Sequence, residues 1–359
     1  MSFIEEISKS PSKSIPTIPG VEFNVPFVIN GTSGDVGIEL EMEGQRLAAG
    51  AGLGSLVSPS GASWTLHNDG SLRNGGVEYV LTKPCMIDEV SPLCEELFDY
   101  IHKQGGVIEH SNRTSTHVHI NVNGMKVSEL TSLICLWGLF EPALIYHCGE
   151  QRRSNHFCLS NSDTRWLPDE WRRALKNGGF HWDNTYKYSA LNLGSFTTFG
   201  SFEIRCMGGA ENAKEVTDWA RMVWALREYA KEVLPDTIGY ATSERSPTGI
   251  LEDICDRYSL DIGKSLLEMP DFDRVCLDNF RDYQGIAFMF PWTDLREEIN
   301  KKHVNNPFGN KKKTKDRWAD VPTPVEIEQA FFPGDPRDPL VIGGPAGVRG
   351  FRVNTIRPN

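Results

Sequence analysis

The chain has 359 residues, of which 37 are Lys or Arg and 48 are Asp or Glu, so its formal net charge is −11. This length is typical of one large domain or of two. The acidic balance argues against a protein built mainly to coat nucleic acid or an anionic membrane.

Cysteine spacing and apolar patterning indicate the cellular compartment. The eight cysteines are scattered without CxxC spacing, and the first 20 residues lack an apolar signal core. No uninterrupted apolar run approaches the roughly 20 residues that span a bilayer. We therefore expect a cytoplasmic protein with reduced thiols and without a membrane-spanning segment.

Hydrophobic periodicity predicts the first elements of the fold. Residues 1 to about 20 are rich in Ser, Pro and Lys, which predicts a flexible arm, and the fold is expected to begin near Val21. Residues 35–43 alternate strictly, which predicts a half-buried strand with an acidic face. One side of this strand carries Val36, Ile38, Leu40 and Met42, and the other carries Gly37, Glu39, Glu41 and Glu43.

The chain up to about residue 234 mixes strands with helices. Further strands are expected at 75–82, 116–122, 187–194 and 200–207, the last two as a hairpin, and helices at about 87–104, 127–148 and 212–234. Because the strands alternate, they favour an antiparallel sheet with one polar face over a buried parallel one. The fold class expected is therefore α+β, with helices packed on the apolar face of the sheet.

The pattern weakens beyond this point, so we divide the chain into a domain over 21–240, a helical extension over 241–318 and a Pro-, Gly- and Arg-rich tail over 319–359. Helices are expected near 249–269 and 292–303. The extension also holds a basic segment, made of Lys301, Lys302, Lys311, Lys312, Lys313 and Lys315. This segment fits a solvated linker or a contact with nucleic acid or an acidic partner, although the net charge does not indicate nucleic acid.

Four segments each place charged or metal-binding side chains on one strand face, since side chains two residues apart share a face. They carry Glu39 with Glu41, His117 with His119, Glu203 with Arg205, and Glu78, which follows Asp69 by nine residues. Carboxylates crowded on one face repel one another unless cations neutralise them. Oxygen ligands with an imidazole suit Mg²⁺ or Mn²⁺, so the pattern predicts a metal site.

Each motif also has an interpretation without chemistry. The glutamate pair of the first strand fits an ordinary solvated strand face, and the histidine pair fits a surface pair or satisfied core groups. Glu203 with Arg205 fits a surface ion pair, and Asp69 fits a turn. Arg152 and Arg153 fit caps at the C-terminal end of the preceding helix. Taken singly, the motifs leave both interpretations open.

Taken together, in order and spacing, the motifs resemble the glutamine synthetase-like carboxylate–amine ligases, and most closely their amidoligase branch. The resemblance covers roughly residues 35–235. Its motifs are GIELE at 37–41, NDGSL at 68–72, VEYV at 77–80, HVHINV at 117–122, a helix with Trp137 and Glu141, RRSNHFC at 152–158, KYSALNL at 187–193 and FEIR at 202–205.

This resemblance implies a curved antiparallel sheet whose concave face binds ATP with two or three Mg²⁺ ions. It implies that one ion is held by Glu41, Asp69 and Glu78, and another by Glu39, His117 and Glu203. It places His119 and Lys187 near the nucleotide phosphates, and Arg152 or Arg153 near phosphate or a substrate carboxylate. It places Arg205 near the substrate carboxylate or the acyl phosphate. Asn192 is expected to be a polar support. The chain departs from the synthetases at Ser201, where they carry an arginine, and at Asp69, where they use a glutamate pair at a similar spacing.

The resemblance implies an enzyme that joins a small-molecule or peptide carboxylate to an amine through an acyl phosphate, with ATP and Mg²⁺ or Mn²⁺. Two other classes stay open. A metal-dependent phosphoesterase or nuclease would also place Asp, Glu and His on a sheet, but it would not need an ATP pocket. A catalytically silent binding module would use the fold as a scaffold. The sequence does not indicate an oligomeric state.

Overall fold

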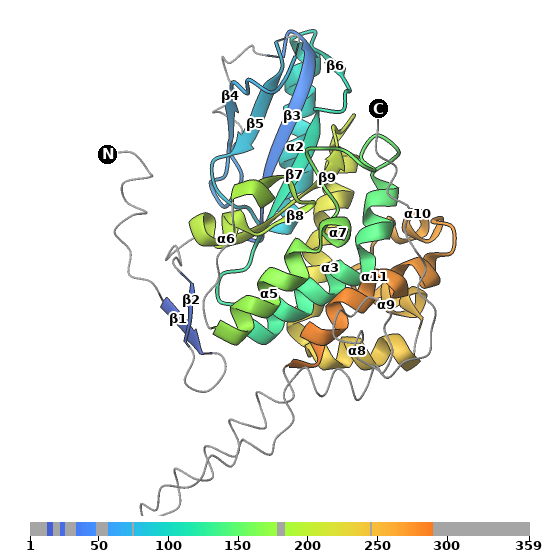
Figure 1. Cartoon of the computed structure of the whole chain (residues 1–359). Helices are drawn as coiled ribbons and strands as arrows, with labels where there is room; N and C mark the ends of the chain where they lie inside the picture. Colours follow the sequence, from blue (N-terminus) through green and yellow to red (C-terminus); the bar gives the residue numbers. More distant parts are fainter. Residues whose placement is uncertain are drawn as a thin grey trace, which may run out of the picture. The chain divides into compact units, whose positions relative to one another are not determined.

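The computed structural model describes residues 13–16, 22–25, 34–47, 57–73, 75–177, 184–244 and 246–289. Within these ranges the fold is α+β, as expected, and its main sheet is antiparallel and open (Figure 1). The predicted helix at 292–303, the basic segment and the tail at 319–359 lie outside the described residues.

The main sheet has seven strands in the described part of the chain, in the order β4-β5-β3-β7-β9-β8, with β6 also paired to β3. All of its strand pairs are antiparallel. The strands are β3 (Val36–Gln45), β4 (Trp64–His67), β5 (Val77–Leu81), β6 (Val107–Glu109), β7 (Ser115–Asn121), β8 (Leu191–Asn192) and β9 (Ser201–Gly208).

Some helices lie between strands of the sheet in the sequence, and the others follow its last strand. Those expected from periodicity are η2 (Ile87–Glu89) with α2 (Val90–Lys103), α3 (Val127–His147), α7 (Ala213–Glu232), α9 (Pro247–Tyr258) and α10 (Gly263–Leu267). The others are α4 (Asn161–Thr164), α5 (Trp166–Asn177), η3 (Asn184–Tyr188), α6 (Gly194–Phe199), α8 (Pro235–Glu244) and α11 (Phe272–Ala287).

Strand alternation separates the two faces of the sheet. On β3 the apolar side chains of Val36, Ile38 and Leu40 are buried, and β7 and β9 bury Val118 and Ile204 in the same core. Helix α7 packs on β7, α3 packs on β9, and α2 packs on α7. Because this helical layer covers the apolar face, the charged residues between these positions lie on the opposite face.

Helix α3 is the one helix in the described ranges that is long and apolar enough to cross a membrane. Most of it is buried inside the protein, where α7, α8, α10 and α11 pack around it. This burial is typical of the central helix of a folded core. The helices after residue 240 therefore share a core with the domain before it.

Two segments differ from their sequence-based predictions. In 187–194, only the two residues of β8 form a strand, and η3 precedes them; β8 pairs with β9 as expected, but α6 connects them in place of a tight turn. Strand β1 (Lys13–Pro16), within the predicted flexible arm of residues 1–20, pairs with β2 (Glu22–Val25) at the start of the predicted domain. Strand β8 lies between η3 and α6, and the side chain of Asn161 bonds to the backbone N–H and carbonyl of Leu191 on its outer edge.

Candidate functional site

Strand register brings the predicted polar residues together on one face of the sheet. On β3, Glu39 lies opposite His117 of β7, and Glu41 lies opposite Glu78 of β5. One step along β7, His119 pairs with Glu203 of β9. Since directly paired residues point to the same side of a sheet, the expected convergence of these side chains is observed.

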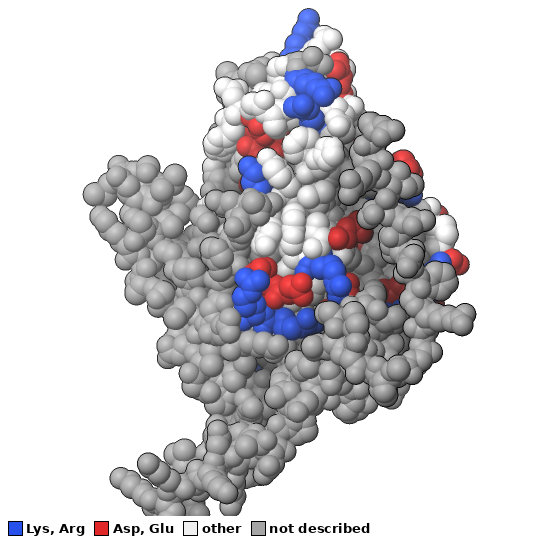
Figure 2. Space-filling view, in the orientation of Figure 1, with Lys and Arg blue, Asp and Glu red and all other residues white. Residues whose placement is uncertain are grey.

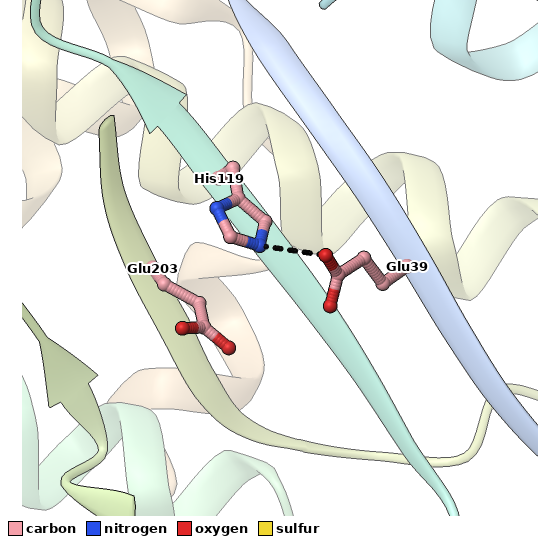
Figure 3. A group of neighbouring side chains, drawn as sticks. All are labelled: Glu39, His119 and Glu203. Atoms are coloured by element: carbon pink, nitrogen blue, oxygen red, sulfur yellow. Dashed lines mark ion pairs between the residues drawn. The ribbon is translucent and has the colours of Figure 1, made fainter. Parts of the chain in front are cut away.

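The two histidines connect the carboxylates. Nδ1 of His117 lies 3.3 Å from Glu39 and 3.6 Å from Glu203, and its Nε2 lies 3.7 Å from Glu41. Nε2 of His119 lies 3.1 Å from Glu39 (Figure 3). Three neighbouring strands thus contribute to one continuous acid–imidazole cluster.

One group of three side chains in this cluster could hold a metal ion: the ligand atoms of Glu39, His119 and Glu203 lie within 4.8 Å of one another (Figure 3). This differs from the expected set, in which His117 was the metal ligand and His119 faced the phosphates. The register explains the difference, because His119 is the direct cross-strand partner of Glu203. His117 lies beside the same two carboxylates, with its Nδ1 3.3 Å from Glu39 and 3.6 Å from Glu203, so its expected role as a ligand stays a prediction.

Charge balance at this group favours ionised carboxylates. Burial opposes ionisation of Glu39, but the positive charge of His119, 3.1 Å away, and the hydrogen bond with His117 hold its pKa well below the usual value. Burial likewise opposes ionisation of Glu203, and Arg205 overrides it and lowers the pKa. For His119, burial is outweighed by Glu39, which raises the pKa to about 9. The imidazolium thus occupies the place of a cation among carboxylates.

A second acidic group lies beside the first. Burial, together with the negative charges of Glu39, Glu41 and Asp69, raises the pKa of Glu78 to about 7. Asp69 also accepts a hydrogen bond from the backbone of Ser71 at 2.7 Å, which is its turn role. Glu41, Glu78 and Asp69 are therefore close enough to interact electrostatically, and carboxylates crowded in this way are neutralised by a cation or by protons.

Arg205 and Asn192 both bind Glu203. The guanidinium of Arg205 donates to Oε1 of Glu203, and the amide of Asn192 donates to Oε2 at 2.7 Å. Asn192 thus supports a carboxylate, in agreement with its expected role as a polar support. Nε of Arg205 is buried and has no hydrogen-bond partner among the described residues, so it is available to an anionic ligand.

The remaining predicted cations lie outside the cluster. The buried guanidinium of Arg152 donates to the backbone carbonyls of Thr114, Arg205 and Cys206, so the geometry favours a structural role in place of the expected phosphate contact. Arg153 pairs with Glu150 at 3.2 Å and lies 4.2 Å from the ring centroid of Tyr146. It therefore makes no described contact with the acid–imidazole cluster.

Lys187 shares an aromatic neighbour, the ring of Tyr188, with Arg205 of the cluster. Its ammonium group lies 4.6 Å from the ring centroid of Tyr188, and the guanidinium carbon of Arg205 lies 6.0 Å from the same centroid. The side chain of Lys187 is exposed. Lys187 and Arg205 therefore lie near the same ring, and the expected place of Lys187 near the nucleotide phosphates stays a prediction.

A cavity of about 290 Å³ opens at the His119 end. Glu39, His119 and Ser201 form its polar wall, and the rest of its lining is largely apolar. The apolar lining includes Ile38, Val80, Leu81, Pro84 and Phe199, and Lys83 lies at the same cavity. A ligand with an anionic part and a flat apolar part fits this combination of walls.

Some residues of the site were not predicted from the sequence. Ser115 bonds to both Glu41 and His117, and Ser201 bonds to Nδ1 of His119 at 3.2 Å. Both serines lie an even number of residues from the predicted histidines or glutamate on their strand, so strand alternation could have identified them. Lys83 follows the end of β5, and no sequence pattern marks it.

Figure 2 shows that charged side chains of both signs are interspersed on one face of the molecule. Lys and Arg side chains lie beside Asp and Glu side chains on the described part that is visible. Interspersed charges of both signs are usual on protein surfaces.

Comparison of the chain with protein-family models gives no match, and comparison with curated proteins gives none. The assignment of a function therefore depends on the residues of the site.

Proposed function

We propose that this protein is an ATP- and Mg²⁺-dependent carboxylate–amine ligase with a glutamine synthetase-like fold. The observation that carries this proposal is the convergence of Glu39, Glu41, Glu78, both histidines, Glu203 and Arg205 on one polar face of an antiparallel sheet. An apolar cavity adjoins this face. Together these features provide metal ligands, a fixed cation and a pocket.

The donor atoms fit hard divalent cations. Carboxylate oxygens with one imidazole are a normal ligand set for Mg²⁺ or Mn²⁺. His119 supports this fit, since its buried Nε2 lies 3.1 Å from Glu39 but makes no hydrogen bond of normal geometry among the described residues. Glu39, His119 and Glu203 would hold one ion, and Glu41 with Glu78 and Asp69 a second.

The proposed reaction explains why the site needs these residue types. A carboxylate is a poor acyl donor, so it is first converted to an acyl phosphate by the γ-phosphate of ATP, and an amine then displaces the phosphate. Bound Mg²⁺ ions would neutralise the phosphate oxygens as charge moves between them. The protein fixes the ligand geometry and keeps the site partly shielded from water.

Arg205 provides a permanent positive charge at the opposite end of the cluster from the cavity. Glu203 orients its guanidinium, while Arg152 holds the strand backbone at Arg205 and Cys206. The free Nε of Arg205 can donate to a substrate carboxylate or to the phosphate of the activated acyl group. We assign Arg205 the binding of the group that reacts.

The cavity would hold the nucleoside of ATP. Its apolar walls suit a base, and its polar wall includes Glu39 and His119 of the acid–imidazole cluster. Lys83, also at the cavity, would provide a phosphate contact of the kind that Ser201 cannot. A phosphoesterase or nuclease could use the same carboxylates, but it would not need to bind ATP.

The proposal is tested with purified protein, ATP, Mg²⁺ and pooled carboxylates and amines. We expect ADP release that requires both a carboxylate and an amine, with a product whose mass equals their sum minus water. Glu203→Gln should abolish this release, and the exposed Glu96→Gln should not. Cleavage of phosphodiesters without ATP would show that the protein is a phosphoesterase instead.

A further inference from the structure

Glu203 has different partners at its two carboxylate oxygens. Asn192 donates to Oε2 at 2.7 Å, whereas Arg205 and His117 approach Oε1, His117 at 3.6 Å. Oδ1 of Asn192 accepts a hydrogen bond from the backbone of Gly194 at 2.8 Å, which fixes the orientation of the amide. Asn192 therefore sets the rotation of the Glu203 carboxylate.

Asn192 depends in turn on a two-residue edge strand that has an unusual outer partner. On one side β8 pairs with β9. On the other side the side chain of Asn161 replaces a further strand: its Oδ1 accepts from the N–H of Leu191 at 2.8 Å, and its Nδ2 donates to the Leu191 carbonyl at 3.0 Å. One fully buried amide thus holds the peptide group next to Asn192.

Asn161 is itself fixed by a buried carboxylate. Glu141 of α3 accepts a hydrogen bond from the backbone N–H of Asn161 at 2.7 Å, and it accepts two more from Ser162, at 2.6 and 3.1 Å. The indole N–H of Trp137 lies 3.2 Å from both Glu141 and Asn161. A continuous chain of hydrogen bonds and backbone therefore runs from the core helix to Glu203.

We propose that Glu141 and Asn161 are positioning residues for Glu203, acting through Leu191 and Asn192. They hold β8 so that Asn192 occupies Oε2 and leaves Oε1 facing the cluster. This inference rests on the proposed function, in which Glu203 is a metal ligand. A residue that orients a metal ligand typically contributes about 10- to 100-fold to metal affinity.

The test is a double-mutant cycle on Mn²⁺ affinity, measured by electron paramagnetic resonance or calorimetry. Asn192→Ala should weaken Mn²⁺ binding about 10-fold, and Asn161→Ala by several-fold. Because Asn161 acts through Asn192, adding Asn161→Ala to Asn192→Ala should cause no further loss of affinity. The melting temperature should still fall further in the double variant, since the two residues also support the fold separately.

A matched control is available at Asn155. This buried asparagine also accepts a hydrogen bond from the backbone two residues later, at 2.9 Å, and donates to backbone carbonyls, but it contacts none of the proposed ligands. Asn155→Ala should lower stability without changing Mn²⁺ affinity. If Asn161→Ala does not fold, Glu141→Gln preserves the side-chain shape and should lower affinity several-fold, again only while Asn192 is present.

Two results would overturn the inference in different ways. Mn²⁺ binding that is unchanged in folded Asn161→Ala or Glu141→Gln, or losses that add fully to that of Asn192→Ala, would overturn the positioning role alone. Absence of Mn²⁺ binding by the unsubstituted protein would overturn the proposed function and this inference with it.

Discussion

Two regions of the molecule bury carboxylates, and the groups that surround these carboxylates differ between the two regions. In the helical layer, Glu141 is fully buried and accepts hydrogen bonds from Trp137, Ser160, Asn161 and Ser162. On the polar face of the sheet, the carboxylates of Glu39, Glu41, Glu78 and Glu203 lie close to one another, and two histidines and one arginine lie among them.

The difference separates a carboxylate whose partners are all supplied by the fold from carboxylates that can take up a ligand. The donors around Glu141 come from its own fold, so its hydrogen-bonding capacity is filled without a ligand. The carboxylates of the sheet outnumber the nearby cations, and burial with like charges raises the pKa of Glu78 to about 7. A cluster with surplus carboxylates next to a cavity is suited to bind a cation that the chain does not itself provide.

The largest effect is expected from Glu203→Gln. The substitution keeps a side chain of the same size and an acceptor for Asn192, but it removes the charge of a proposed metal ligand. Carboxylate- and amine-dependent ADP release should fall at least ~1,000-fold. The reason is that loss of a metal ion would raise the activation free energy by about 4 kcal/mol. Steady-state ADP assays measure this, and an unchanged melting temperature shows that the fold is intact. Full activity would place the metal site elsewhere.

The helical layer should respond mainly in stability. Glu141→Ala leaves several buried donors without an acceptor, so it should lower the free energy of unfolding by about 3 kcal/mol or more. Glu78→Gln relieves repulsion among carboxylates and should leave this free energy unchanged or raise it. Chemical denaturation of both variants without added metal measures the contrast. If both lose stability equally, the two regions do not differ in the proposed way.

The alternation of β3, β7 and β9 allowed the sheet, its polar face and most of the cluster to be predicted from the sequence. A period of two assigns each side chain to a face, and here it placed Glu39, His119 and Glu203 on the polar one. It cannot determine strand register, which decides that His119 and not His117 pairs directly with Glu203.

Other parts depend on contacts between residues far apart in the chain. The segment at 187–194 has strand-like composition, but Asn161 pairs with Leu191 from 30 residues away, and strand structure is confined to β8. The family resemblance placed Arg152 or Arg153 near phosphate or a substrate carboxylate. The burial of Arg152 against three backbone carbonyls could not be deduced from local sequence.

A smaller effect on catalysis is expected from Arg205→Lys. Lysine keeps the positive charge but lacks the planar group that can bind Glu203 and a ligand at once. Amide formation in a single turnover should slow ~100-fold, equivalent to about 2.7 kcal/mol, while affinity for a non-hydrolysable ATP analogue persists. Arg153→Lys, outside the cluster, should leave both unchanged. If Arg205→Lys reacts like the parent, the residue is an ion-pair partner of Glu203 only.

Lys83→Ala tests the cavity end of the sheet site. Loss of one phosphate contact should weaken ATP-analogue binding ~10-fold, or about 1.4 kcal/mol, without changing Mn²⁺ affinity measured in the absence of nucleotide. Lys103→Ala, an exposed lysine on α2, is the control. Equal ATP-analogue affinity for both variants would mean that the cavity does not receive the nucleotide next to Lys83.

The same contrast between the two regions extends to their histidines and predicts a small pH effect. His147 lies in the helical layer, where it stacks on Trp219 and bonds to Ser265 at 2.8 Å, and burial lowers its pKa. The unfolded chain takes up a proton near pH 6.5, whereas the folded imidazole stays neutral to lower pH. This stabilisation is therefore complete above about pH 6.5 and is lost as the pH falls through the folded pKa.

Melting temperatures of the parent protein and His147→Gln, compared between pH 7.5 and 5.5, measure this effect. The parent should lose more stability on acidification than the variant, because only the parent has an imidazole that protonates more readily when unfolded. His102→Gln, at an exposed histidine, is the control and should lose as much stability on acidification as the parent protein does. For His119 the shift is reversed, since Glu39 raises its pKa to about 9. Equal pH slopes for the parent and His147→Gln would show that burial in the helical layer does not control this histidine, and the contrast with the sheet would then hold for carboxylates alone.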